Sequence, residues 1–284
     1  MKTLIRRSIV ALAFVPSVAF SQEVGRNEKV WTWEGRVETG RWFRLSSING
    51  AVTVEASSDN RVHVRAEKEP GRRGEITDVA FQVIQKGGDV SICALWRGDV
   101  CDEDGLRSRG NNRDDREDRD VKVRFTVSVP AGVHVNAGTV NGAMTVRNVT
   151  ADVRASTVNG AVEVEHVGGQ VRATTVNGAV DVSTRNGPVT ATTVNGNVDV
   201  KMTAIAREGE MKFTTVNGRV RVEMPENLNA TVEMETMHGS ISSDYPVQLS
   251  GTFGPRRAQG TIGRGGPRIE LETLNGSIEL RKSR

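Results

Sequence analysis

The chain has 284 residues, with 38 Lys and Arg against 35 Asp and Glu, which gives a formal net charge of +3. Three of the basic residues and none of the acidic ones lie within residues 1–21, so residues 22–284 carry 35 charges of each sign. A chain that is neutral overall gives no support to the binding of nucleic acid or of an anionic membrane surface.

Residues 1–21 have the pattern of a cleavable export signal. The positive start consists of Lys2, Arg6 and Arg7, and the apolar stretch is Ser8–Phe20. Small residues, Ala19 and Ser21, occupy the two positions that signal peptidase reads. The apolar stretch is too short for a membrane-spanning helix, and no later stretch is long enough. We predict an exported protein without a membrane span, periplasmic or at the cell surface, whose mature domain is residues 22–284.

The start of the mature domain is rich in tryptophan, at Trp31, Trp33 and Trp42. Such rings can stack on sugars, but we favour the interpretation that they cap one end of the core. Polar and apolar residues then alternate at Arg61–Ala66, as they do in a half-buried strand. No segment longer than ten residues has a convincing helical period, so the sequence predicts an all-β chain.

Cys93 and Cys101 are the only two cysteines. In an oxidising compartment two cysteines this close are expected to form a disulfide that closes a small loop. Residues 99–120 follow, with charges of both signs and almost no apolar side chains. Such a segment cannot offset its ordering entropy by burial, so we predict a mobile charged insertion.

The second half of the chain repeats the motif Thr-Val-Asn-Gly-x-Val/Met-x-Val. The copies are Thr139–Val146, Thr157–Val164, Thr175–Val182, Thr193–Val200 and Thr215–Val222, of which the first four are 18 residues apart and the fifth follows at 22. A fixed period near 20 residues indicates small units that bury their apolar faces against one another. We expect the Val and Ala columns of these units to build the core.

Two architectures fit this repeat. Asn-Gly between alternating strands is typical of a type I′ hairpin, which would give an antiparallel β-meander. Alternatively, each unit of about 18 residues forms two strands and two turns of a single-stranded parallel β-solenoid. We favour the solenoid, because stacking of like on like explains why Asn, Thr and Val each recur at one register.

The Asn-Gly pairs are interpreted as structural turns rather than as ligand-binding groups. Turns that need a positive φ explain both residue types. The predicted turn ladder consists of Asn141, Gly142, Asn159, Gly160, Asn177, Gly178, Asn195, Gly196, Asn217 and Gly218.

Glu163, Asp181 and Asp199 form the sharpest candidate for a chemical site. In a solenoid they would stack on one outer face, roughly 4.8 Å apart per strand. Carboxylates at this spacing could act as a glycosidase pair or hold a cation. An ordinary solvated face is the favoured interpretation, and the sequence contains no motif for a catalytic centre, a metal site or a cofactor.

Several of these motifs occur together in one known family. The export signal, the lead-in Val127–Gly132, the serial Thr-Val-Asn-Gly units and the closing Leu274–Leu280 resemble the bacterial "putative adhesin" family of exported β-strand-repeat domains. The resemblance covers roughly residues 30–284. It implies a β-helix-like fold at the cell envelope, and it brings no catalytic residues with it.

From fold and export we predict a non-enzymatic protein that presents a binding surface to a protein or glycan partner in the cell envelope, as an adhesin does. This prediction rests on association rather than on a site. The alternatives are a periplasmic scaffold or sensor in envelope stress, and a polysaccharide-active enzyme that uses the acidic column.

Overall fold

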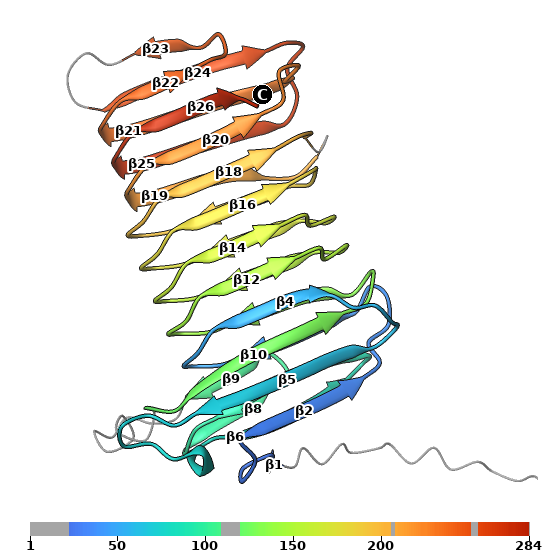
Figure 1. Cartoon of the computed structure of the whole chain (residues 1–284). Coiled ribbons are helices and arrows are strands. Elements are labelled where there is room, and N and C mark those ends of the chain that lie inside the picture. Colours follow the sequence, from blue (N-terminus) through green and yellow to red (C-terminus); the bar gives the residue numbers. More distant parts are fainter. Residues whose placement is uncertain (1–22, 109–119, 206–207, 251–254, 284) are drawn as a thin grey trace, which may run out of the picture.

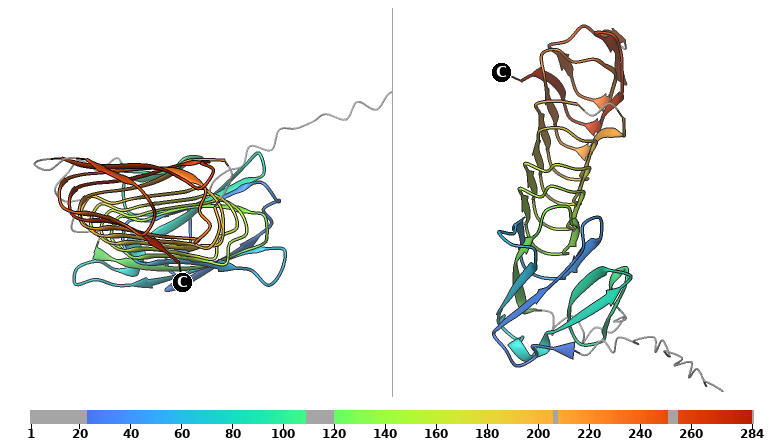
Figure 2. Two further views of the ribbon diagram at one scale, coloured as in Figure 1. Left: turned by 90° about the horizontal axis from the view of Figure 1, so that it is seen from above. Right: turned by 90° about the vertical axis from the view of Figure 1, so that its right-hand side faces the viewer.

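The computed structural model describes residues 23–108, 120–205, 208–250 and 255–283, which form an almost entirely β structure. Two large sheets follow the length of the molecule and face each other across its core (Figures 1 and 2). The predicted all-β class with parallel sheets is therefore confirmed. The predicted export signal lies outside the described residues.

Sheet A contains 13 strands among the described residues. In spatial order they are β1 (Glu23–Val24), β6 (Ala80–Lys86), β7 (Asp89–Leu95), β3 (Trp42–Ser46), β11 (His134–Gly138), β13 (Val153–Ser156), β15 (Val171–Thr174), β17 (Val189–Thr192), β19 (Met211–Asn217), β25 (Arg268–Asn275), β21 (Ala230–His238), β24 (Arg256–Ile262) and β23 (Gln248–Ser250).

Sheet B contains 11 strands in the same part of the chain. In spatial order they are β2 (Val30–Gly35), β5 (Val62–Glu69), β10 (Lys122–Val129), β4 (Val52–Ala56), β12 (Met144–Arg147), β14 (Val162–Glu165), β16 (Val180–Thr184), β18 (Val198–Met202), β20 (Val220–Met224), β26 (Ile278–Lys282) and β22 (Ile241–Ser243). A short 3₁₀ turn, η1 (Ile76–Asp78), and a separate pair of strands, β8 (Asp99–Asp102) and β9 (Gly105–Ser108), complete the structure.

Successive units of the repeat pair in parallel, with identical positions side by side. Val162 of β14 lies opposite Val180 of β16, which lies opposite Val198 of β18. The strands before Asn159 and after Gly160, β13 and β14, lie in different sheets. A hairpin would pair these two strands with each other, so the alternative of an antiparallel Asn-Gly meander is wrong for these repeats. We call one strand of each sheet with its two turns a coil.

Most of the Val and Ala columns fill the space between the sheets, but one Val column does not. Val162 and Val164 are fully buried, whereas the valines before the Asn-Gly pairs are 36–37% exposed: Val140, Val158, Val176 and Val194. The preceding threonine points inward at this corner, so the valine, next in the alternation, points outward. The prediction that all Val columns build the core is wrong for this one.

The corner that carries the Asn-Gly pairs is tied together by side-chain ladders. Each Asn donates its Nδ2 to Oδ1 of the Asn in the preceding coil at 2.7–2.9 Å, in the order Asn49, Asn141, Asn159, Asn177, Asn195, Asn217 and Asn275. The buried threonines bond the backbone, as when Thr175 Oγ1 donates to the carbonyl oxygen of Gly160 at 2.9 Å. This corner therefore has the same contacts in coil after coil.

The glycines of this corner are needed for a reason other than the predicted one. Gly142, Gly178 and Gly196 do not have the left-handed φ that a positive-φ turn requires. Instead, a Cβ on Gly178 would lie 2.0 Å from the carbonyl oxygen of Gly160 in the adjacent coil. Close approach of two stacked backbones excludes a side chain there, so the positive-φ explanation is wrong at these three positions.

The substitution Asn177→Ala should cost about 1–2 kcal/mol of unfolding free energy, because it removes two amide–amide hydrogen bonds. These bonds join Asn177 to Asn159 and to Asn195, both at 2.9 Å. Chemical denaturation would measure the loss. Asn197→Ala is the control, because it removes a single hydrogen bond outside the ladder, from the backbone N–H of Arg219 at 3.0 Å. An equal or larger loss for that variant would contradict a special role of the ladder.

The N-terminal end of the solenoid is closed by a mixed cap. Strands β3 and β4 pair in parallel with β11 and β12, and β10 pairs in parallel with β4 but antiparallel with β5. Trp31 is buried here and stacks on Phe81 with ring centroids 4.6 Å apart. Trp33 packs against the core from a partly buried position. Trp42 points to the outer face of sheet A, so the prediction of a tryptophan cap does not hold for it.

A buried lysine joins the segments of this cap. Lys68 is fully buried, and its Nζ lies 2.5–3.0 Å from four backbone carbonyl oxygens, those of Gly25, Arg26, Ile76 and Val79. Burial lowers the pKa of Lys68 to about 8. The carbonyl oxygens compensate the buried ammonium in place of a carboxylate.

The C-terminal end departs from chain order. Strand β25 lies between β19 and β21, and β26 lies between β20 and β22, although β25 and β26 come last in the sequence. All four pairings are parallel, for example Phe213 with Leu271 and Met234 with Leu271. Strands β21 to β24 therefore form a cap whose strand pairing with the rest of the stack runs through the last coil (top of Figure 1). Tyr245 adds a direct contact, because its hydroxyl donates to the carbonyl oxygen of Met224 at the end of β20 at 2.9 Å.

The predicted insertion at residues 99–120 is partly ordered. Residues 99–108 form the β8–β9 hairpin, with Cys101 and Gly105 buried and Leu106 packed against the core. A disulfide joins Cys93 of β7 to Cys101 of β8, with Cα atoms 5.9 Å apart. Cys101 and Leu106 pack into the hydrophobic clusters and give this part enough burial to fold, so a mobile loop over the whole range is wrong. Residues 109–119 lie outside the described residues.

Candidate functional site

The acidic column lies on the outer face of sheet B. Glu163 of β14, Asp181 of β16 and Asp199 of β18 occupy matching register positions on neighbouring parallel strands. Apolar neighbours on both sides of each acidic residue point into the core, and this alternation directs the three carboxylates outward. The column is therefore assembled by the repeat itself.

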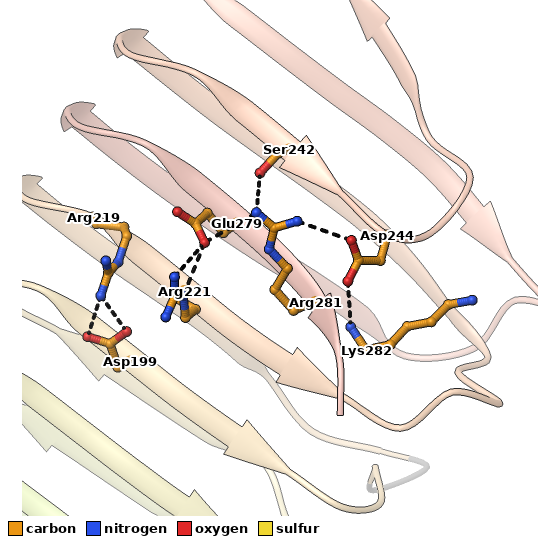
Figure 3. Close-up of polar contacts among 8 residues, drawn as sticks. All are labelled: Asp199, Arg219, Arg221, Ser242, Asp244, Glu279, Arg281 and Lys282. Carbon is orange, nitrogen blue, oxygen red and sulfur yellow. Dashed lines mark hydrogen bonds and ion pairs between the residues drawn. The ribbon is translucent and has the colours of Figure 1, made fainter. Parts of the chain in front are cut away.

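Two of the three carboxylates have an arginine partner. Arg147 of β12 contacts Glu163 Oε2 at 3.0 Å and Glu165 Oε2 at 2.8 Å. Arg219, just before β20, contacts Asp199 Oδ1 at 3.0 Å (Figure 3). These pairs place one guanidinium beside Glu163 and one beside Asp199, on the two sides of Asp181.

Asp181 differs from its neighbours because no cation of the described residues pairs with it. It lines a depression of about 290 Å³ together with the charged residues of the surrounding strands: Glu163, Glu165, Asp199, Lys201, Arg221 and Glu223. Shielding from water by these neighbours, followed by the negative charges of Asp199 and Glu163, raises the pKa of Asp181. The surroundings of Asp181 thus increase the proton affinity of its carboxylate.

The substitution Asp181→Asn should stabilise the protein at neutral pH by less than about 1 kcal/mol, since solvent screens a charge on an outer face. A raised pKa means that the folded chain binds this proton more tightly than the unfolded chain, so stability falls as the pH rises through the titration. The gain should disappear below the ordinary pKa of 3.8. Thermal unfolding between pH 3 and pH 7 would measure it.

Asp199→Asn is the matched control for this experiment. It makes the same chemical change one strand away, but it removes the partner of Arg219 and should lower the stability at pH 7. Loss of stability in Asp181→Asn at pH 7 would contradict the assigned electrostatics.

Further along the same face the charges are paired again. Arg221 donates to Glu279 Oε2 at 2.9 and 3.1 Å, and Arg281 donates to Asp244 Oδ1 at 3.1 Å (Figure 3). Partial burial opposes ionisation of Glu279, but Arg221 and Arg281 outweigh it and lower its pKa. The backbone N–H of Lys282 and then Arg281 lower the pKa of Asp244. This network joins β20, β26 and β22 and stabilises the C-terminal end.

No group of three or more His, Cys, Asp or Glu side chains within the described residues has the arrangement of a metal site. The acidic column thus consists of two arginine-bound carboxylates and one solitary carboxylate. Chemically, it can attract a cationic group or exchange a proton at Asp181.

Residues 120–281, more than half of the chain, match the Toastrack DUF4097 family. The chain belongs to this family. The match begins at the lead-in strand β10 and ends within β26, so it includes all five Thr-Val-Asn-Gly units and both strands of the last coil. The family resemblance inferred from the motifs is confirmed.

Solved structures of three bacterial proteins are similar to this Toastrack chain. A putative cell adhesion protein from Clostridium sporogenes has 10% identity and a TM-score of 0.35, with 90% of this chain and 100% of that chain covered. A putative adhesin from Bacteroides fragilis has 10% identity and a TM-score of 0.39, covering 89% and 97%. A putative adhesin from Parabacteroides distasonis has 9% identity and a TM-score of 0.29, covering 89% and 97%.

Among curated proteins, none matches this chain. The residues that the structure describes include no helix with the length and apolar character needed to cross a membrane.

Sequence reasoning missed two arginines on the opposite face. Arg154 and Arg172 are adjacent on the outer face of sheet A and are both exposed. The signal was present in the sequence, because Val153–Ala155 and Val171–Ala173 align with an arginine at the centre of each. Only the pairing of neighbouring strands reveals that two like charges are held side by side.

Proposed function

We propose that this protein is a non-enzymatic binding protein of the cell envelope, which uses the outer faces of its sheets as an adhesive surface. The distribution of polar groups carries this proposal. In the described coils the inner faces are packed with apolar side chains, whereas charged side chains form ordered columns along the outside. Chemistry or recognition must therefore take place on the exposed faces, which are long and regular.

The predicted export signal adds the location to this proposal. An exported domain with large outer faces can meet a protein or glycan partner without opening its core. Binding at the cell surface would make it an adhesin, and binding within the periplasm would make it an envelope scaffold or sensor.

The test uses purified residues 22–284 carrying a fluorescent label, together with cells that express the full chain with a C-terminal epitope. Saturable binding of the labelled domain to cells or isolated envelopes is expected. Antibody access to the epitope on intact cells would favour the adhesin, and access only after permeabilisation would favour the periplasmic scaffold. The proposal would be overturned if the labelled domain showed no saturable binding to any envelope fraction.

An enzyme acting on polysaccharides is the second candidate, and the raised pKa of Asp181 between two carboxylates is the observation that favours it. This second function predicts that the wild-type protein releases reducing ends from a polysaccharide and that the Asp181→Asn variant does not. The proposed binding function instead expects no cleavage by either protein and equal binding by both.

A further inference from the structure

The outer face of sheet A carries a pair of stacked arginines. Arg154 of β13 and Arg172 of β15 are direct neighbours in the parallel register, and both side chains are exposed. Parallel strands lie roughly 4.8 Å apart, and like charges directly opposite each other destabilise a sheet. The fold therefore accepts an unfavourable contact at this point, and we call these two residues the arginine pair.

Neither side chain of the arginine pair has a carboxylate partner among the described residues. On the same sheet A column, Arg44 contacts Asp89 at 2.8 Å and Lys212 contacts Glu270 at 3.0 Å. The side chains of the arginine pair make no hydrogen bond with any other described residue. Their guanidinium N–H groups are thus available to an anion from outside.

Trp42 fixes one member of the pair in place. The Cζ atom of Arg154 lies 4.6 Å from the centroid of the Trp42 ring, and that ring stacks on His134 at 4.9 Å. A guanidinium held over an aromatic face keeps its N–H groups free at the edge. Asp152, two residues before Arg154 in the chain, accepts from the backbone N–H of Gln170 at 2.9 Å and lies 3.4 Å from His134 Nδ1.

A column of hydroxyl groups runs beside the arginine pair. Ser156, Thr174 and Thr192 occupy matching positions on β13, β15 and β17, next to the arginine column. Hydroxyls can donate to and accept from sugar hydroxyls, while arginine forks bind carboxylate or sulfate groups. Because cations and hydroxyls are arranged along an open face that spans several strands, an extended polymer fits better than a compact anion.

We propose that the outer face of sheet A from β3 to β17 binds an acidic polysaccharide. Arg154 and Arg172 contact its carboxylate or sulfate groups, and the hydroxyl column contacts its sugar hydroxyls. The inference deepens the binding function proposed above and rests on it.

The experiment measures binding of residues 22–284 to polygalacturonate and to dextran sulfate, with methyl-esterified polygalacturonate and dextran as the uncharged counterparts. The wild-type domain should bind at least one charged polymer, more weakly at high salt because screening reduces the attraction, and should not bind the uncharged ones. R154A/R172A should bind at least 30-fold more weakly, on the basis of roughly tenfold for each lost charge-assisted contact.

R61A/R65A is the charge-matched control, since it removes Arg65 of β5 and Arg61 directly before that strand, at the N-terminal end of sheet B. Each of these has a carboxylate partner, Arg61 with Glu34 and Arg65 with Glu67 at 3.5 Å. It should bind the polymer as the wild-type domain does. Thermal unfolding would confirm that R154A/R172A stays folded, which is expected because the substitution relieves a repulsion.

Equal binding by the wild type and R154A/R172A, binding to neither charged polymer, or tighter binding to vesicles of anionic lipid would overturn the inference. If polymer binding fails while cells or envelopes still bind the domain, the binding function stands and only the acidic polysaccharide is excluded. Loss of both would exclude the proposed function as well.

Discussion

Gly178→Ala is expected to lower the free energy of unfolding by about 3 kcal/mol or more. The added Cβ would lie 2.0 Å from the carbonyl oxygen of Gly160 and 2.5 Å from its carbon, far inside van der Waals contact. Both atoms belong to backbone that is itself hydrogen-bonded in the stack, so neither can move without separating two coils. Chemical denaturation of the purified domain would give the value.

Two other glycines separate close approach from backbone conformation. A Cβ on Gly138 would have Ser156 Oγ, the end of a movable side chain, at 3.2 Å as its nearest neighbour, so Gly138→Ala should cost little. Gly40 has a φ of +79° with no atom within 4 Å of an added Cβ, so Gly40→Ala should cost only about 1 kcal/mol for the left-handed backbone. If Gly40→Ala lowered the free energy of unfolding more than Gly178→Ala did, turn conformation rather than stacking would explain the Asn-Gly motif.

Removal of residues 268–284 is expected to unfold the C-terminal cap while leaving the central coils intact. The deletion takes away β25 and β26, which separate β19 and β20 from β21 and β22. Four side chains of the deleted segment are fully buried: Ile269, Leu271, Ile278 and Leu280. The burial of each contributes about 1.5–3 kcal/mol, and we expect their combined loss to exceed the folding free energy of a small cap. Strands β21 and β22 would have no parallel partner left.

Hydrogen exchange would detect this separation within one molecule. Amides of β21 and β24 should lose their protection in the shortened chain, whereas those of β14 and β16 should keep it, since each coil depends mainly on its neighbours. A chain that lacks only Ser283 and Arg284 retains β26 and is the control. Protection of β21 in the chain without residues 268–284 would mean that the cap docks directly on β19 and β20.

The central coils were predictable from sequence because each residue pairs with the residue at the same position of the neighbouring repeat. Recurrence of Thr, Asn and Val at one spacing is what stacking of like on like requires, and hairpins give no reason for such identity. The acidic column followed from the same argument, since Glu163, Asp181 and Asp199 share one register position. Their individual surroundings did not follow, because Arg147 and Arg219 reach them from other register positions.

The ends were not predictable, because their order in space differs from their order in the chain. Residues 236–241 resemble a weakened repeat that precedes the closing Leu274–Leu280 motif, and nothing local indicates that the second inserts ahead of the first. The β8–β9 hairpin was missed for another reason: Val100, Cys101 and Leu106 are few among many charges, and their burial depends on the disulfide and on packing against β7 and β3.

The two long edges of the solenoid differ in how much variation they permit. At the edge with the Asn-Gly pairs, the side-chain hydrogen bond from Asn217 to Asn195 is kept at 2.9 Å, even though 22 residues rather than 18 separate the two. In the sequence, the four extra residues fall between the end of β18 and the start of β19, which is the other connection of this coil. Insertions of this kind can therefore be accommodated at one edge without loss of the hydrogen bonds at the other, so related chains can differ in their loops while the stacked frame stays constant.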